Sequence, residues 1–514
     1  MSIISVVGII PIPTTQSIGK EEIHMQTKTP LPRRLLALLT ILCLLTSATA
    51  CATTGNPPEE TSPHQNVSPG ETEASYNLDE LPADLDYNGD EVVVLTSAGE
   101  INVDKVTGNI LNDILFERNQ AVERRLNISF SFIQDASAID KLGMAINAGD
   151  DEYDILIEAA WRAIIKSTEN YFLNLRQTEH LDFDKIWWSQ GFNEAFAYND
   201  AQYAVTGDML LSPYRRTYAT VFNKDLFTKA NQTFLYEYVD DHTWTLDKQT
   251  ALIPLFHQDN GNHVQDMDDD IYGFVSTTHI YVDCYWAACE VDIIRKNMDG
   301  EYEWVFSPEK IYDVTEKLLA LYYQDGSYIE QDNAVSEATP RSIFSGGKSA
   351  MATLCMDILE TPEMRLMTQE YGVVPMPKYS EEQTSYHSQM HDGFHIISIP
   401  STTSEERSDM LSSVLEAMGS TSYQNVRPIY YETVLRTQIA SDPQSAAMMD
   451  TIINNIYIDI EFAYTHQLGT FHHKLQEVMK SGRIDNITST FKQASKASQK
   501  ALAQLVQKLN QLSN

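Results

Sequence analysis

Alternating apolar strands and amphipathic helices between residues 89 and 161 limit the possible fold more than any other feature of the sequence. The apolar run "GDEVVVLTSAG" (89–99) predicts a buried strand, and "ISFSFI" (128–133) alternates like a second one. Between them, Ile110 and Ile114 begin an apolar pattern at helical spacing, and a second helical stretch precedes the apolar "YDILIEAAW" (153–161). This order predicts an α/β fold with a parallel sheet, in which ligands lie beyond the carboxyl ends of the strands.

A basic, then apolar, then small-residue segment precedes this region. It is "RRLLALLTILCLLTSATAC" (33–51), and its apolar part is shorter than the roughly 20 residues needed to cross a bilayer. We therefore predict an export signal over residues 1–50, with Met25 as the true start. Cys51 directly follows the small residues, which resembles the lipobox of bacterial lipoproteins and predicts acylation of Cys51. An ordinary secretory signal with an incidental cysteine is the alternative.

The next segment cannot form a core. "ATTGNPPEETSPHQNVSPGETEAS" (52–75) is rich in Pro, Ser, Thr and Glu and contains one large apolar residue. We expect the lipidated Cys51 and a disordered tether over 51–87 to hold a folded domain at the extracellular face of the bacterial cytoplasmic membrane.

Composition narrows the classes of partner. With 514 residues, 43% of them hydrophobic, the chain can bury a large core, and about 430 residues after the tether indicate two or more domains. A formal charge of -36 argues against nucleic acid and anionic lipid as partners. Beyond the signal and Cys51 the cysteines are Cys284, Cys289 and Cys355, without a CxxC pair. No glycine-rich phosphate loop, HExxH or GxSxG motif occurs, so we predict no enzyme, no cofactor and no metal.

Ten short motifs follow one another along the mature chain. They are "AGDDEYDIL", "WW", "YAVTGD", "VFNKDLF", "WTLDK", "DDDIYGF", "FSGGKSAM", "YGVVPMPKY", "IISIP" and "RPIYYETVL". This order resembles the family 1 extracellular solute-binding proteins of carbohydrate ABC transporters, the group that includes maltose-binding protein. The resemblance implies a protein that captures a carbohydrate, expected to be an oligosaccharide, and delivers it to ABC permease subunits without chemistry. We expect a monomer.

The resemblance also implies the architecture, a two-lobed periplasmic-binding-protein fold of type II with lobes joined by hinge strands. In such proteins the lobes close over the ligand by a hinge motion. We expect lobe one to comprise 88–220 and 395–440, and lobe two to comprise 221–392 and 441–514, including the C-terminal helices.

Several segments are placed around the interlobe cleft by this resemblance. Trp161 and Arg162 follow a predicted strand. The segment "HIYVDCYWAACE" (279–290) matches the place where relatives present stacking aromatics. As a strand it would send Tyr281, Asp283 and Tyr285 to one face and Trp286 to the other. Packing without ligand contact is the alternative for each residue. The expected ligand-binding residues are Trp161, Arg162, Asp208, Tyr281, Asp283, Tyr285, Trp286, Asp357, Asp392, Tyr430 and Tyr431.

One acidic loop has two interpretations. "DNGNHVQDMDDDIYG" (259–273) resembles an aspartate-rich loop of these proteins, which is similar to an EF-hand calcium loop. Gln258 stands at the first ligand position and His263 replaces the turn glycine. The alternative to calcium is a solvated turn containing Asp266, Asp268, Asp269 and Asp270.

Other prominent features are assigned to packing. We expect Trp244 to precede a helix whose N-cap is Thr245, and Trp187 and Trp188 to pack on a lobe surface. The ending "FKQASKASQKALAQLVQKLNQL" (491–512) has helical composition without glycine or proline.

Two rival functions stay open. A secreted glycoside hydrolase would need two carboxylates on either side of one sugar. The same fold could bind a peptide, a polyol or a uronate. Arg215 and Arg216 lie near the point where the chain is expected to pass from lobe one to lobe two, and they are the reason why anionic sugars stay possible ligands.

Overall fold

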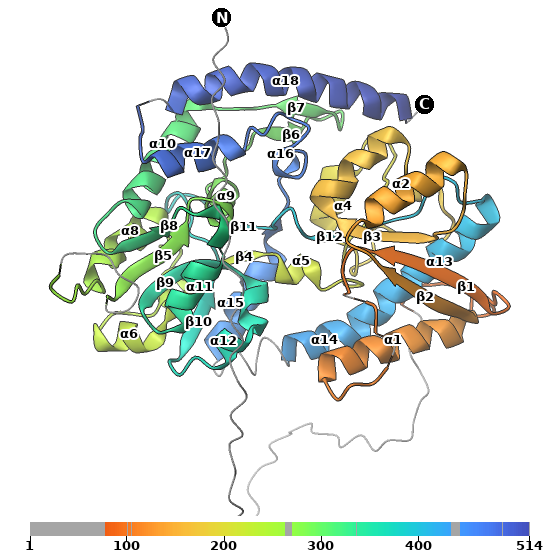
Figure 1. Ribbon diagram of the computed structural model, residues 1–514, viewed down its shortest axis with the longest axis horizontal. Coiled ribbons are helices and arrows are strands. Elements are labelled where there is room, and N and C mark those ends of the chain that lie inside the picture. Colours follow the sequence, from red (N-terminus) through yellow and green to blue (C-terminus); the bar gives the residue numbers. More distant parts are fainter. Residues whose placement is uncertain are drawn as a thin grey trace, which may run out of the picture. The chain divides into compact units, whose positions relative to one another are not determined.

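Two β-sheets of different size carry the fold, each with its own helices (Figure 1). The computed structural model describes residues 78–99, 101–103, 105–262, 270–335, 337–432, 443–485 and 487–512. These belong to one compact unit, Ser75–Asn514. The predicted signal and Cys51 lie outside the described residues. Within the described part, no helix is both long and apolar enough to cross a bilayer.

The four-stranded sheet confirms the α/β segment predicted from the sequence. In spatial order it contains β12 (His395–Ser398), β3 (Ile155–Ala159), β1 (Asp90–Thr96) and β2 (Ile128–Gln134), with α1 (Ile110–Leu126) and α2 (Ala138–Ala148) between strands. β1 pairs in parallel with both β2 and β3, and β12 is antiparallel to β3. α1 begins at Asn109, whose side-chain oxygen accepts the N–H of Leu111 at 3.0 Å. We call this sheet with its helices the first lobe.

The second sheet has five strands and forms the centre of the second lobe. Its order is β10 (Tyr371–Val374), β4 (Tyr218–Asn223), β9 (Ser349–Cys355), β5 (Tyr272–Thr277) and β8 (Ser327–Glu330). β5 is parallel to β8 and β9, whereas β4 is antiparallel to β9 and β10. Every residue of β4, β5, β9 and β10 is buried, which explains their continuous apolar runs.

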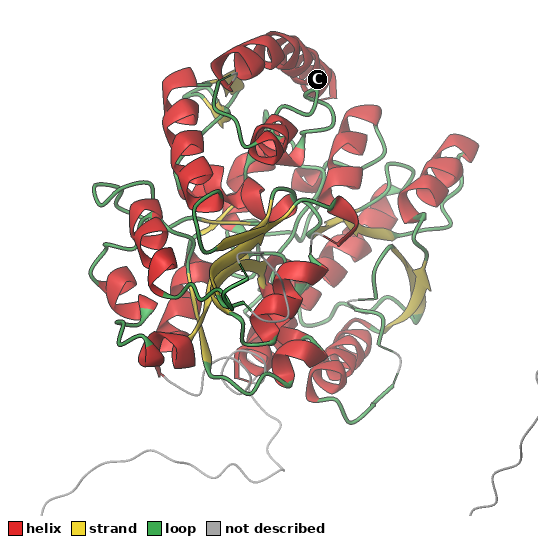
Figure 2. Cartoon of the chain, turned by 60° about the vertical axis from the view of Figure 1, so that its left-hand side comes forward, coloured by secondary structure: helices red, strands yellow, loops and turns green. Residues whose placement is uncertain are grey.

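Helices surround the strands of both sheets (Figure 2). Those of the first lobe are α3 (Ala160–Ala163), η1 (Ile164–Glu169), η2 (Leu175–Gln177), α4 (Gln190–Phe196), α13 (Glu405–Thr421), the π-helix η6 (Ser422–Val426) and α14 (Arg427–Tyr430). α13 packs against α1. A further short helix, α5 (Ser212–Arg215), lies between the lobes in sequence.

The second lobe holds the remaining elements. They are α6 (Lys224–Lys229), α7 (Leu235–Asp240), α8 (Leu246–Leu252), η3 (Ile253–Leu255), α9 (Ile280–Ala288), β6 (Ile294–Lys296), β7 (Tyr302–Trp304), α10 (Pro308–Tyr322), η4 (Asn333–Val335), α11 (Ala338–Ser345), η5 (Met356–Glu360), α12 (Pro362–Arg365), β11 (Ser388–Gln389), α15 (Pro443–Asn454), β13 (Ile456–Tyr457), α16 (Ile460–Ala463), α17 (His473–Ser481) and α18 (Ile487–Leu512). α8 begins at Thr245, whose hydroxyl accepts the N–H of Lys248, which confirms the predicted N-cap.

Two described segments, 205–217 and 388–394, run side by side between the sheets, and we call them the first and the second crossing. Val205 exchanges backbone hydrogen bonds of 2.9 and 2.8 Å with Ile397, and the N–H of His391 donates to the carbonyl of Arg216 at 2.7 Å. The boundary expected at residue 220 falls inside β4, which pairs entirely within the second sheet.

Two other expectations differ from the structure. Trp187 and Trp188 do not lie on a lobe surface, because both are 2% exposed and belong to the core. The expected tether over 51–87 includes residues 78–87, which pack on the first lobe. There Leu81 is buried and Asp79 forms an ion pair with Arg125 of α1.

Candidate ligand-binding site

The structure divides the sequence-predicted ligand residues into three groups. The first lies at the carboxyl ends of strands β3 and β9, the second lies on α9, and the third surrounds α14. Their members are Trp161, Arg162, Asp357 and Asp392; Tyr281, Asp283, Tyr285 and Trp286; and Asp208, Tyr430 and Tyr431.

Trp161 is the aromatic residue of the first group, and its ring is partly exposed. β3 ends at Ala159, and the backbone N–H of Trp161 donates to the carbonyl of Asp392 at 3.1 Å, which fixes the tryptophan beside the second crossing. Its side chain is 39% exposed, an unusual state for the largest apolar residue. The Arg162 guanidinium lies 5.8 Å from the indole centroid and the ring of His466 lies 5.6 Å from it. An open indole held in this way is a platform on which the apolar face of a sugar ring can stack.

Arg216 connects Trp161's surroundings to the second lobe. It forms an ion pair with Asp357 of η5 at 3.2 Å, and both side chains are about one third exposed. Its carbonyl oxygen accepts the N–H of His391. Sequence reasoning noted Arg216 only as a charge near the crossing. Its pairing with Asp357 depends on how the two lobes meet, and no sequence pattern shows that.

The protonation states of the crossing are set mainly by burial. Burial, together with the positive charge of Arg216 and a smaller effect of His279, lowers the pKa of His391 to about 3, so this ring is neutral. The His391 Nδ1 then accepts the N–H of Gly393 at 2.9 Å. Burial raises the pKa of Asp392 to about 6, against the opposing effect of His472 and Arg216. Burial also raises the pKa of Asp357, and Arg216 opposes this shift.

Three buried polar atoms at the end of β5 make no hydrogen bond within the described part of the chain. They are Thr278 Oγ1, His279 Nδ1 and the Tyr281 hydroxyl. β5 is parallel to β9, so these residues follow the same sheet edge as Asp357. Burial, with the nearby negative charges of Glu337 and Asp357, raises the pKa of Tyr281 well above its usual value, so its hydroxyl keeps its proton. Unpaired buried polar atoms are costly, and hydroxyls of a ligand could satisfy them.

The other expected residues of the second group, Asp283, Tyr285 and Trp286, lie in the core of the second lobe. The segment is the helix α9 and not a strand. Tyr285 bonds Thr353 at 2.8 Å, and Trp286 packs against His472 with ring centroids 4.8 Å apart. The Asp283 carboxylate accepts two hydrogen bonds from the side-chain amide of Gln476, at 3.0 and 2.8 Å. All three side chains are buried, and these internal contacts are what the structure shows for them.

The third group is also committed to internal contacts. Asp208 is buried, accepts a hydrogen bond from Tyr214 and pairs with Arg427 at 3.3 Å. The Tyr430 hydroxyl donates to Glu360 at 3.0 Å, and Arg215 binds the same carboxylate through two bonds of 2.7 Å. Ligand contact by Asp208 and Tyr430 stays a prediction, because the structure shows only their internal contacts. Tyr431 lines a hollow of about 410 Å³ with Tyr423, Gln424, Arg427, Pro428, Asp450 and Asn454.

No cluster suited to a metal ion occurs among the described residues. Of the acidic loop, Asp266, Asp268 and Asp269 lie outside the described residues. Asp270 is buried and accepts the N–H of Asn260 at 3.1 Å.

Comparison with known proteins places the fold. The sequence matches no family model and no curated protein. Solved structures do match. An ABC substrate-binding protein of Listeria monocytogenes in complex with cycloalternan is 14% identical, with a TM-score of 0.52 over 81% of this chain and 99% of its own. Apo RafE of Streptococcus pneumoniae is 13% identical, with a TM-score of 0.52 over 79% and 98%.

A third solved structure that matches is UgpB of Mycobacterium tuberculosis in complex with glycerophosphocholine. It is 14% identical, with a TM-score of 0.53 over 81% of this chain and 99% of its own. The chain has the fold of ABC-transporter substrate-binding proteins. This substrate-binding-protein fold confirms the two-lobed α/β architecture expected from the sequence. In it the first group of residues and the β5 edge occupy the carboxyl ends of both sheets, where ligands of open α/β sheets bind.

Proposed function

We propose that the chain is the substrate-binding protein of a bacterial carbohydrate ABC transporter. The observation that carries the proposal is the partly exposed Trp161, whose backbone N–H bonds the carbonyl of Asp392, while the preceding residue His391 bonds the carbonyl of Arg216 in the Arg216–Asp357 pair. An aromatic platform next to charged hydrogen-bonding groups is the chemistry that recognises a sugar ring with its hydroxyls. Similar solved structures hold cycloalternan and maltotetraose, which supports an oligosaccharide.

The pairing of charges favours a neutral sugar over an anionic ligand. Arg162 pairs with Glu158 at 3.2 Å, Arg215 with Glu360 and Arg216 with Asp357. A guanidinium already neutralised by a carboxylate can still donate hydrogen bonds to hydroxyls, but it offers less attraction to a uronate or a phosphate. The glycerophosphocholine complex of UgpB shows that the fold admits other chemistries, so anionic ligands belong in the test.

The cellular part of the proposal rests on the N-terminal sequence. The signal over residues 1–50 exports the chain, and acylation of Cys51 anchors it at the extracellular face of the cytoplasmic membrane. We keep the expected lobes 88–220 with 395–440 and 221–392 with 441–514, except that the first boundary moves to precede β4, which belongs to the second sheet. The protein works as a monomer that closes over its ligand and presents the closed form to permease subunits.

A thermal-shift screen tests the function. The protein is heated with oligosaccharides, polyols, uronates and peptides, and each hit is analysed for cleavage. A sugar that raises the melting temperature and is recovered intact supports capture. Recovery of cleaved sugar would instead establish the rival hydrolase, for which Asp357 and Asp392 are the first carboxyl groups to replace.

Site variants complete the test. Trp161→Ala removes the platform and is expected to abolish the shift. Ile186→Ala removes a side chain that is 61% exposed elsewhere and should leave the shift unchanged. Equal loss in both variants, or none in Trp161→Ala, would place the ligand elsewhere.

A further inference from the structure

The two lobes touch at a further place besides the crossing segments, the Tyr430–Glu360 hydrogen bond and the Trp161–His466 ring contact. The β6–β7 hairpin and the C-terminal end of α18 contact the end of α4 in the first lobe. Figure 1 shows α18 extending from the second lobe above the helices of the first. We call this set of contacts the clasp; its residues are Lys296 and Tyr302 of the hairpin, Leu509 and Asn510 of α18, and 194–199 of the first lobe.

The end of α4 explains why the hairpin binds there. The last carbonyl groups of a helix have no partner within the helix and attract cations. Lys296 donates to the carbonyl oxygens of Glu194 and Ala197. The hydroxyl of Tyr302 donates to the carbonyl of Ala195 at 2.8 Å and is itself buried. The second lobe therefore supplies the cap for a helix of the first lobe.

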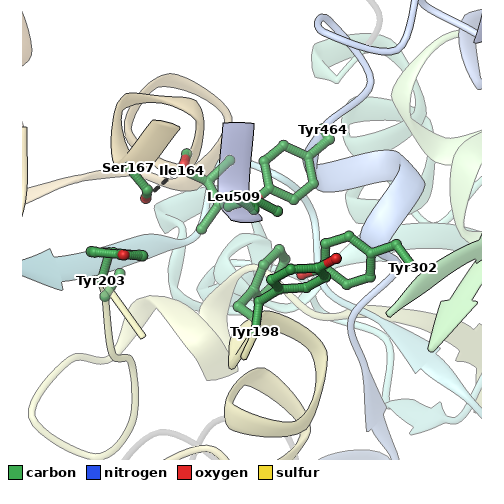
Figure 3. Close-up of a pocket in the computed structure, with 9 residues that line it drawn as sticks. Ile164, Ser167, Tyr198, Tyr203, Tyr302, Tyr464 and Leu509 are labelled. Carbon is green, nitrogen blue, oxygen red and sulfur yellow. Dashed lines mark hydrogen bonds between the residues drawn. The ribbon is translucent and has the colours of Figure 1, made fainter. Parts of the chain in front are cut away.

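The end of α18 completes the contact. The side-chain amide of Asn199 donates to the side-chain oxygen of Asn510 at 2.7 Å. Leu509 enters a ring of apolar side chains from both lobes, which Figure 3 shows together with Tyr198, Tyr302 and Tyr464. The rings of Tyr198 and Tyr302 lie 5.1 Å apart. The remaining space is about 10 Å³, roughly that of one water molecule, so this surface is closely packed.

A hollow of about 730 Å³ adjoins the clasp. Its lining includes Glu194 and Lys296 of the clasp and His387, just before the second crossing. The clasp and the crossings are therefore distinct contacts. A body joined at two separated places cannot rotate freely about one of them.

We propose that the clasp restrains the movement of the two lobes and must loosen whenever they change their separation. The clasp thereby makes the relative populations of the open and closed forms depend on residues outside the candidate ligand-binding site. The meaning of this movement for transport rests on the proposed function. The restraint itself does not, because it exists without ligand.

Pulsed electron paramagnetic resonance on the full chain tests the clasp. Spin labels are placed at Met144→Cys in the first lobe and Leu366→Cys in the second, which are 66% and 79% exposed. Cys43 and Cys51 are replaced by alanine. The buried Cys284, Cys289 and Cys355 can stay.

The clasp variant combines Lys296→Met and Tyr302→Phe, which keep most of the side-chain volume, with Asn510→Ala, which removes the amide. Its matched control is Lys310→Met with Tyr379→Phe, an ammonium 3.9 Å above a tyrosine ring within the second lobe. Without ligand, we expect the width of the interlobe distance distribution to increase at least twofold in the clasp variant and to stay unchanged in the control. An unchanged width in a folded clasp variant would overturn the restraint.

A second measurement covers the case in which the triple variant fails to fold. Asn199→Cys with Asn510→Cys, joined by a short bismaleimide, fastens the clasp and should narrow the distribution relative to the unlinked protein. A linked protein as broad as the unlinked one would also overturn the restraint. Absence of any sugar hit would refute the proposed function while leaving these distances as they are.

Discussion

We expect the stability of the protein to fall between about pH 6 and about pH 9, because of a buried cluster around His472. This ring has no exposed surface. Its Nδ1 lies 3.3 Å from a Glu461 oxygen, and its Nε2 lies 3.7 Å from an Asp283 oxygen. Asp459 is buried in the same cluster. Burial opposes the charge of His472, but Glu461 and the aspartates outweigh it and raise its pKa to about 9. Burial raises the pKa values of Asp283 and Asp459 to about 7.

The sign follows from proton uptake. A group whose pKa is higher in the folded state stabilises that state below its unfolded pKa, and this contribution is lost as the pH rises through the folded pKa. His472 and the two aspartates all shift upward, so all three act in the same direction. For His472 alone, a rise from 6.5 to about 9 corresponds to about 3 kcal/mol. If the second lobe unfolds as a unit, the melting temperature falls by roughly 5–10 °C across this range.

Calorimetry on two variants isolates the cluster from the general repulsion of an acidic surface. His472→Gln removes the cation that lies 3.3 Å from Glu461, so we expect a lower melting temperature at pH 6 and a shallower decline above pH 8. His242→Gln changes an exposed histidine and should follow the wild type. A wild-type melting temperature that is flat or rises toward pH 9, or equal slopes for wild type and His472→Gln, would refute the reasoning.

Three further substitutions have definite outcomes. Trp188→Phe removes the indole N–H that donates to Glu416 at 3.0 Å, and we expect a loss of about 1–3 kcal/mol in unfolding free energy, seen as a lower melting temperature; an unchanged value would mean that the bond contributes nothing. Gly419→Ala places a Cβ 2.5 Å from the Trp187 ring and should cost about 1–3 kcal/mol, whereas Gly191→Ala in α4 meets nothing closer than 3.8 Å and should be neutral or stabilising; the reverse order would contradict the packing. Asn109→Ala removes the cap of α1 and should cost about 1 kcal/mol by thermal unfolding, with Asn112→Ala as the control within the same helix.

Local periodicity was enough to predict the first sheet but not α9. The segment containing β1, α1 and β2 alternates between periods of two and 3.6 residues, and these patterns have one interpretation each. The stretch "IYVDCYWAA" is buried on nearly all sides, so its apolar residues show no period that separates a helix from a strand. The same full burial hides which of its side chains point toward a ligand.

The candidate site likewise contains residues that the sequence could predict and contacts that it could not. Trp161 could be predicted because it directly follows an apolar strand, and carboxyl ends of parallel strands carry ligand sites. Thr278 and His279 follow β5 in the same way, so the same rule applied to "YGFVST" would have found them. Contacts such as Arg216 with Asp357 join residues about 140 positions apart, and only the meeting of two lobes brings them together.

A strongly negative net charge of the whole chain is compatible with a candidate site whose positive and negative charges nearly cancel. The formal charge of -36 comes largely from solvated side chains, whereas the acids near the crossings are paired with arginines or raised in pKa. A neutral sugar needs hydrogen-bond partners whose charges already cancel, because stray charge in a closing cleft would lose its water without compensation. Arg216 with Asp357 is such a partner pair, and the neutral His391 behind it adds no charge. Asp357→Asn removes this carboxylate charge beside Arg216, and we expect weaker binding of neutral sugars and a new affinity for uronates, which titration calorimetry with a matched glucose and glucuronate oligomer would measure. Unchanged preference in that variant would mean that the pair does not face the ligand.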